Sequence, residues 1–217
     1  TLTNQLNAEL TASGSGQVAG TLVNEGNLTL SGSGIYRLLG NKFINSNEDE
    51  GYLINKSHLK ADNQLVLLGG QLVNEGTSEL KDVQIVNGQL KNNNGSVIIS
   101  GTTLIETAAA NSPGSVAKDI VAISNSETAQ IGFVDLQLKR GIIEGGTLGT
   151  EDSVGTVYAD GAIRNADAVF KDLTNAGLTN VGKLTTKSSF TNSGTANLVT
   201  ADVTGLVNET AGTVMVK

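Results

Sequence analysis

A short pattern recurs through this chain and restricts its possible folds more than any other feature. Its clearest copy, at residues 22–28, reads leucine, valine, asparagine, glutamate, glycine, asparagine and leucine. The common form is two residues that are apolar or threonine, then asparagine, any residue and glycine. Whole or partial copies occupy residues 2–6, 43–51, 53–59, 72–76, 85–88, 173–177, 178–182, 190–194 and 206–212. Such self-similarity indicates a chain built from stacked structural repeats.

The spacing of the copies predicts the size of one repeat. Several of their asparagines lie near 20 residues apart, and others near 10 or 13. We therefore predict a solenoid whose coil has about 20 residues and more than one corner. The predicted corner residues are Asn24, Gly26, Asn45, Asn55, Asn74, Gly76, Asn175, Gly177, Asn192, Gly194 and Asn208.

The residue types of the motif suggest why it would form a corner. Asparagine and glycine both tolerate positive φ, and asparagine also hydrogen-bonds its own backbone. In stacked coils, equivalent asparagine side chains would lie above one another and share amide hydrogen bonds. We therefore expect Asn24, Asn45 and Asn74 to stack, with their apolar neighbours pointing into the core.

Between the motifs the sequence alternates between apolar and polar residues. Residues 27–31, 195–199 and 213–217 show this period of two, which is typical of half-buried strands. Strands are also predicted over 120–123 and 131–138, and a coil with a Gly-Gly corner over 142–148. No window has helical periodicity. The sequence predicts one all-β domain over residues 1–217: a parallel β-helix of about ten coils with almost no helix and with loop excursions near 46–50 and 106–118.

Composition argues against several classes of partner. The net charge is −7 and only three arginines occur, whereas binding to nucleic acid or anionic lipid needs clustered basic residues. The chain has no cysteine, which excludes disulfides and thiolate metal sites. No apolar run approaches the ~18 residues of a membrane span. We expect no nucleic-acid partner, no membrane insertion and no cofactor.

Few residues are candidates for catalytic chemistry. His58 is the only histidine and falls at a predicted corner, where we expect it to face solvent. Arg140, next to Lys139, could approach a carboxylate, although a surface ion pair is the simpler interpretation. Paired carboxylates could act in glycoside cleavage or hold a cation. The candidates are Glu48, Asp49, Glu50, Glu144, Glu151, Asp152, Asp160, Asp167 and Asp172. We expect the first three to form a solvated loop, and we predict no catalytic or metal site.

The segments at 22–28, 142–148 and 190–196 resemble the degenerate repeats of large bacterial exoproteins, the filamentous-haemagglutinin-like adhesins and autotransporter passengers. The resemblance covers most of the chain. It implies a right-handed parallel β-helix, secretion or display on a bacterial surface, and a role as a stalk or adhesive surface. The family's N-terminal secretion signature is not found, so we expect an internal segment or a related free-standing protein.

Function is predicted from this architecture. Neither end shows an obvious polar cap, and an uncapped coil invites pairing with another chain. We expect either a piece of a longer solenoid or a subunit that stacks end to end. The prediction is a non-enzymatic structural or adhesive solenoid that contacts cell-surface glycans, proteins or other copies of itself. The alternative is a carbohydrate-active β-helix enzyme or carbohydrate-binding module. An enzyme should have a groove with two carboxylates about 5–10 Å apart beside a basic residue.

Overall fold

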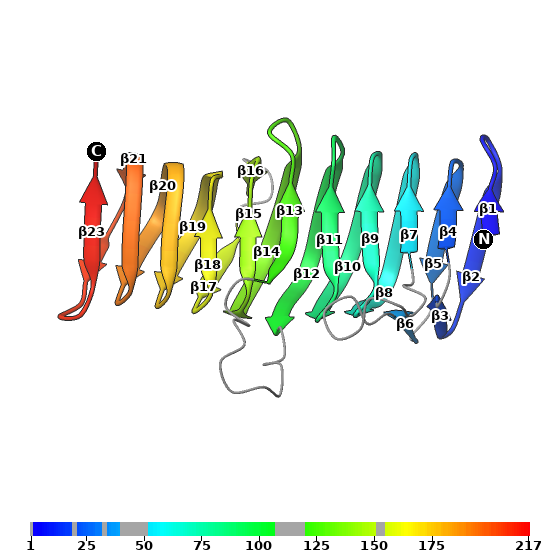
Figure 1. Cartoon of the computed structure of the whole chain (residues 1–217), viewed down its shortest axis with the longest axis horizontal. Coiled ribbons are helices and arrows are strands. Elements are labelled where there is room, and N and C mark those ends of the chain that lie inside the picture. The colour runs from blue at the N-terminus through cyan, green and yellow to red at the C-terminus, as the bar shows by residue number, and fades with distance from the viewer. Residues whose placement is uncertain (1, 19–20, 32–33, 40–51, 107–119, 151–154) are drawn as a thin grey trace.

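The computed structural model describes residues 2–18, 21–31, 34–39, 52–106, 120–150 and 155–217. Within these ranges the chain forms strands and no helix, and all the strands join one sheet. Figure 1 shows that the sheet winds into coils stacked along a single axis, with the two ends of the chain at opposite ends of the stack. The predicted all-β parallel β-helix is confirmed. The predicted excursions lie outside the described residues, except that Glu106 ends a strand.

Each coil has three sides, which the coil of residues 71–88 defines. Side A is β9 (Gln71–Asn74), and sides B and C are the two halves of β10 (Thr77–Val86). This strand bends where its register to the preceding coil shifts, between Leu80 and Asp82. A register shift of this kind lets a strand turn without ending. We name the corners AB (residues 75–76), BC (near residue 81) and CA (residues 87–88).

Corresponding strands of successive coils pair in parallel throughout the described structure. Side A consists of β1 (Leu2–Asn4), β4 (Thr21–Asn24), β7 (Tyr52–Asn55), β9, β11 (Gln89–Asn92), β13 (Val121–Asn125), β15 (Ile142–Glu144), β18 (Ala162–Arg164), the starts of β20 (Leu178–Asn192) and β21 (Thr195–Val203), and β23 (Thr213–Val216). Sides B and C consist of β2 (Glu9–Ser13), β3 (Gly16–Val18), β5 (Asn27–Ser31), β6 (Ile35–Leu39), β8 (His58–Leu68), β10, β12 (Ser96–Glu106), β14 (Gln130–Arg140), β16 (Thr147–Leu148), β17 (Thr156–Ala159), β19 (Asp167–Asn175), β22 (Leu206–Asn208) and the remainders of β20 and β21.

The core is a set of side-chain columns that run along the axis. On side A, successive register partners are Leu2, Leu22, Leu53, Leu72, Leu90, Ile123, Ile143, Ile163, Thr179, Ala196 and Val214. Ten steps separate the ends of this column, in agreement with about ten coils. The six members from Leu53 to Ile163 are at most 1% exposed. Burying a leucine or isoleucine so completely stabilises the fold by about 1.5–3 kcal/mol.

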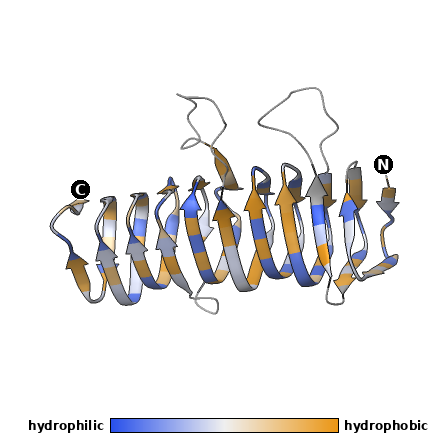
Figure 2. Cartoon of the chain, turned by 90° about the horizontal axis from the view of Figure 1, so that it is seen from below, coloured by the Kyte–Doolittle hydropathy of each residue, from blue (hydrophilic) through white to orange (hydrophobic). Residues whose placement is uncertain are grey.

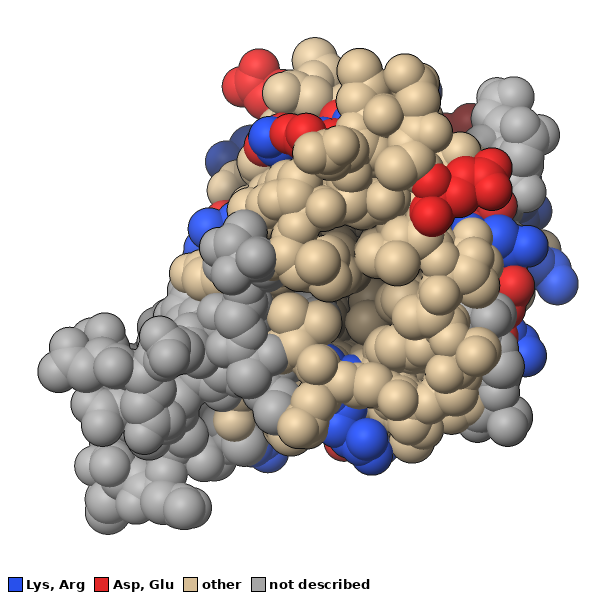
Figure 3. Space-filling model, turned by 90° about the vertical axis from the view of Figure 1, so that its right-hand side faces the viewer, with Lys and Arg blue, Asp and Glu red and all other residues tan. Residues whose placement is uncertain are grey.

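Outward-facing residues complete the alternation that the sequence predicts. Figure 2 shows hydrophobic and hydrophilic residues interspersed along the strands. Seen from the N-terminal end of the stack, uncharged residues dominate and charged ones lie mostly around the rim (Figure 3). No membrane-spanning helix occurs in the part of the chain that the structure describes.

Candidate functional site

Asparagine side chains form a hydrogen-bonded column at corner AB of the N-terminal coils, which we call the AB ladder. In each step, Nδ2 of one asparagine donates to Oδ1 of the next, at 2.8–2.9 Å. The members are Asn4, Asn24, Asn55, Asn74, Asn92 and Asn125. All six are buried. Each amide thus finds its partner in the next coil, which ties the coils together.

Two details of the AB ladder differ from the sequence-based prediction. Asn55 stands between Asn24 and Asn74, where we expected Asn45, and Asn45 itself lies outside the described residues. Asn92 and Asn125 were missed because no glycine follows them two residues later. A shorter pattern at the end of a strand does identify them: an apolar residue, then any residue, then asparagine.

A second column, the CA ladder, lies at a different corner. Asn175 donates to Asn192 at 2.7 Å, and Asn192 donates to Asn208 at 2.8 Å. Asn175 is the register partner of Ala159, which in turn pairs with Leu138 on side C. Among the copies that form ladders, the same motif therefore occupies corner AB in the first half of the chain and corner CA in the last coils.

In one copy of the motif the asparagine does not take the inward corner position. In residues 178–182, Thr179 is buried in the core column of side A, and Asn180 faces solvent. The strand β20 passes through corner AB without ending, and Lys183 already belongs to side B. The buried residue before this corner is Val181, so this copy contributes no asparagine to a ladder.

Glycine is needed in the motif because a side chain there would overlap the backbone of the preceding coil. The sequence-based prediction that these glycines adopt positive φ was wrong. Positive φ in the described residues falls at other glycines and at Asn7, Asn87 and Asn165, none of which belongs to a ladder. A Cβ on Gly76 would lie 2.1 Å from the carbonyl oxygen of Ser57 in the preceding coil. Gly26, Gly177 and Gly194 have equivalent contacts at 2.1–2.3 Å.

Three of the four candidate carboxylates that the structure describes bind neighbouring coils. Glu144 accepts from Arg164 Nε at 2.9 Å, and Asp167 accepts from the Lys183 amide at 2.9 Å. Asp172 accepts from the hydroxyl of Ser189 at 2.7 Å. Glu48, Asp49, Glu50, Glu151 and Asp152 lie outside the described residues.

The remaining candidates are placed as follows. His58 is partly exposed at the start of β8, on the outward side of the strand with Lys60, in keeping with the expectation. Asp160 lies beside Lys139 and Arg140 in a hollow described next. No group of three histidine, aspartate or glutamate side chains suited to a metal ion occurs in the described ranges.

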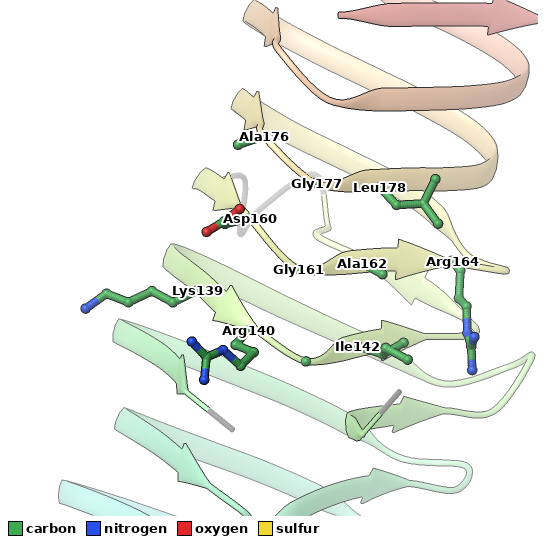
Figure 4. Close-up of a pocket in the computed structure, with 11 residues that line it drawn as sticks. Lys139, Arg140, Ile142, Asp160, Gly161, Ala162, Arg164, Ala176, Gly177 and Leu178 are labelled. Carbon is green, nitrogen blue, oxygen red and sulfur yellow. The ribbon is translucent and has the colours of Figure 1, made fainter. Parts of the chain in front are cut away.

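A groove of about 540 Å³ crosses corner CA and reaches the coil in which the CA ladder begins. We call it the corner groove. Its lining includes Gly141, Gly161 and Gly177, the corner glycines of three successive coils, which we call its floor. The lining residues are Lys139, Arg140, Gly141, Ile142, Asp160, Gly161, Ala162, Arg164, Ala176, Gly177 and Leu178. Figure 4 shows Lys139 and Arg140 on one side of the groove and Arg164 on the other.

The charges around the corner groove are unequally paired. Lys139 Nζ lies 2.7 Å from Glu106 Oε1, and Arg164 binds Glu144. Arg140 forms no ion pair with any described residue. Asp160 is the one carboxylate among the lining residues.

The backbone of the groove floor is already hydrogen-bonded. Ala162 N–H donates to Gly141 O at 3.0 Å, and Leu178 N–H donates to Gly161 O at 3.1 Å. Gly177 N–H donates to Ala159 O at 3.0 Å. A ligand in this groove must therefore be recognised through side chains. Comparisons of the chain with protein-family models, curated proteins and solved structures found no match.

Proposed function

We propose that this protein is a non-enzymatic structural and adhesive β-solenoid of a bacterial surface or secreted protein, forming part of an adhesin stalk, fibre or sheath. The observation that carries the proposal is that its polar side chains form hydrogen bonds between coils. The asparagines of both ladders, together with Glu144, Asp167 and Asp172, bind neighbouring coils. Side chains used in this way make a rigid rod with long outer surfaces, which suits a spacer or a contact surface.

Adhesion is tested with beads that carry the chain in one orientation. Beads are incubated with cultured epithelial cells and with bacterial cells, and bound beads are counted. We expect saturable binding that free chain inhibits, with albumin-coated beads as the control. Binding that free chain does not inhibit would contradict an adhesive role.

The structural role has its own measurements. Ten steps of about 4.8 Å give a rod about 50 Å long, which small-angle scattering measures directly. Association of copies end to end is part of the proposal, and light scattering should show a mass that rises with protein concentration. A mass that stays monomeric at all concentrations would exclude fibre formation by this chain alone.

A carbohydrate-binding module is the second candidate, and the corner groove is the observation that favours it. A concave surface with exposed cationic and apolar side chains is the usual form of a small-ligand site. Binding of labelled glycans to the isolated chain distinguishes this candidate from a pure spacer, which should bind none.

A further inference from the structure

We infer that the corner groove binds the carboxylate-bearing sugar units of an acidic polysaccharide, a hexuronate being the simplest. The inference rests on the proposed adhesive function and names its ligand class. It is drawn from three properties of the groove: the charge of Arg140, unpaired among the described residues, the apolar side chains of its lining, and backbone N–H groups that are already hydrogen-bonded to other coils.

Charge favours a carboxylate as the group that is recognised. The Arg140 side chain is exposed at the groove and has no ion-pair partner among the described residues. Its planar guanidinium can hold a carboxylate through two parallel hydrogen bonds. The chain as a whole carries a net charge of −7, and an unpaired arginine in a hollow offers an anionic ligand a cation to pair with. Lys139, which pairs with Glu106, lies on the same side of the groove (Figure 4).

The rest of the lining matches a sugar better than a simple anion. Asp160 offers carboxylate oxygens that accept hydrogen bonds from hydroxyl groups. Leu178 is 36% exposed, and Ala162 and Ala176 are half-buried beside it. These side chains form an apolar surface for the C–H face of a sugar ring. A sugar acid is a ligand that can use a cation, a hydroxyl acceptor and an apolar patch together.

The backbone argues against an acidic peptide. Peptides that bind solenoids or sheet edges commonly do so by adding a strand, which requires free N–H and C=O groups. Here the amides of Ala162, Gly177 and Leu178 already bind other coils. A glycan needs no such groups, because its hydroxyls and carboxylates meet side chains.

The dimensions permit more than one sugar unit. The volume of about 540 Å³ is within the ~300–1,000 Å³ of ordinary ligand sites. The three floor glycines belong to successive coils, two steps of about 4.8 Å apart in all. An extended chain lying along the axis would contact all three coils.

Isothermal titration calorimetry with trigalacturonate tests the inference. We expect saturable binding by the intact chain and binding at least tenfold weaker to the methyl ester, which keeps the hydroxyls but has no charge. R140A should also weaken binding about tenfold or more, because it removes charge-assisted hydrogen bonds. Circular dichroism establishes that the variant is folded, which we expect because the Arg140 side chain is exposed.

R37A is the matched control, because Arg37 is exposed on β6, away from the groove. It should bind trigalacturonate as the wild type does. Absence of wild-type binding at millimolar trigalacturonate, equal binding of the methyl ester, or an equal loss in R37A would each overturn the inference. Equally tight binding of poly-L-glutamate would show a general anion site and would overturn it as well.

The two proposals fail in different ways. If trigalacturonate does not bind but coated beads still adhere to cells, the groove inference fails and the adhesive function stands. If trigalacturonate binds through Arg140 but the beads do not adhere, the adhesive function fails and the site remains.

Discussion

Ala159 and Asn175 are register partners in successive coils, and Ala159 leaves the buried Oδ1 of Asn175 without a hydrogen-bond donor. The CA ladder therefore begins with an unsatisfied acceptor. An unpaired buried polar atom costs about 1–3 kcal/mol. The coil that contains Ala159 has no asparagine to donate to Asn175 Oδ1. The same coil contributes residues 160–162 to the corner groove.

Replacing Ala159 by asparagine should extend the CA ladder by one coil. The new Nδ2 would donate to Asn175 Oδ1, which offsets the cost of fitting a larger side chain against Leu138. We expect A159N to stay within about 1 kcal/mol of the wild type in urea unfolding. A159D has the same shape but sets an acceptor and a buried charge against Oδ1, and should be at least about 3 kcal/mol less stable than A159N. Equal destabilisation by both would contradict the ladder argument.

Removing an amide from the middle of the AB ladder should be costly. Asn74 accepts from Asn55 and Ser78, and donates to Asn92 and to the Gly76 carbonyl. N74A leaves several of these groups unpaired, so we expect a loss of about 2–4 kcal/mol in the free energy of unfolding.

The control for N74A is N208A, because Asn208 is exposed at the end of the CA ladder. It should cost no more than about 1 kcal/mol. The comparison uses unfolding midpoints followed by circular dichroism, since a solenoid need not unfold in one step. A larger loss in N208A than in N74A would show that ladder hydrogen bonds do not hold the coils together.

Replacing a motif glycine by alanine should destabilise the fold, because the added Cβ would overlap backbone atoms of the preceding coil. In G76A the new Cβ would lie 2.1 Å from the Ser57 carbonyl oxygen, a backbone atom that cannot move freely. We expect a loss of at least about 2 kcal/mol. In G182A the nearest atom is Asp167 Oδ1 at 2.8 Å, the end of a flexible side chain. That variant should stay within about 1 kcal/mol of the wild type, and thermal melts of the pair would detect the difference.

The outer face of side C carries a row in which carboxylates and hydroxyls alternate. Asp135, Thr156, Asp172 and Ser189 are successive register partners. Ser189 Oγ donates to Asp172 at 2.7 Å, and Thr156 Oγ1 lies 3.5 Å from the same carboxylate. A hydroxyl between two carboxylates keeps like charges two coils apart.

T156D would place three carboxylates in successive coils about 4.8 Å apart. We expect it to be less stable than T156N at pH 7, by about 1 kcal/mol for each new neighbouring pair, since the row is partly exposed. The repulsion is electrostatic and the row is partly exposed, so the difference should shrink as salt is added. Urea midpoints of both variants at low and at high ionic strength measure this, and a difference that does not change with salt would refute charge repulsion as its cause.

Local sequence was sufficient for the strands because alternation directly reflects which face of a strand is buried. The strands predicted over 120–123 and 131–138 correspond to β13 and β14, and the Gly-Gly corner lies between β15 and β16. The corner groove was not predicted, although Lys139, Arg140 and Asp160 had each been noted. Asp160 is about 20 residues from Lys139 and Arg140 in the chain, and the three line one groove only because successive coils stack.

The sequence by itself therefore determined that this is a coiled parallel β-structure with inward asparagine corners. Only the tertiary structure decided which corner each asparagine occupies. Asn74 at corner AB and Asn175 at corner CA stand in the same local motif, because both corners need an inward amide and a glycine without a Cβ. Which corner a copy of the motif forms depends on its register to the preceding coil. That register is set by contacts between residues far apart in the chain. The groove lies beyond the last coil of the AB ladder and reaches the coil in which the CA ladder begins.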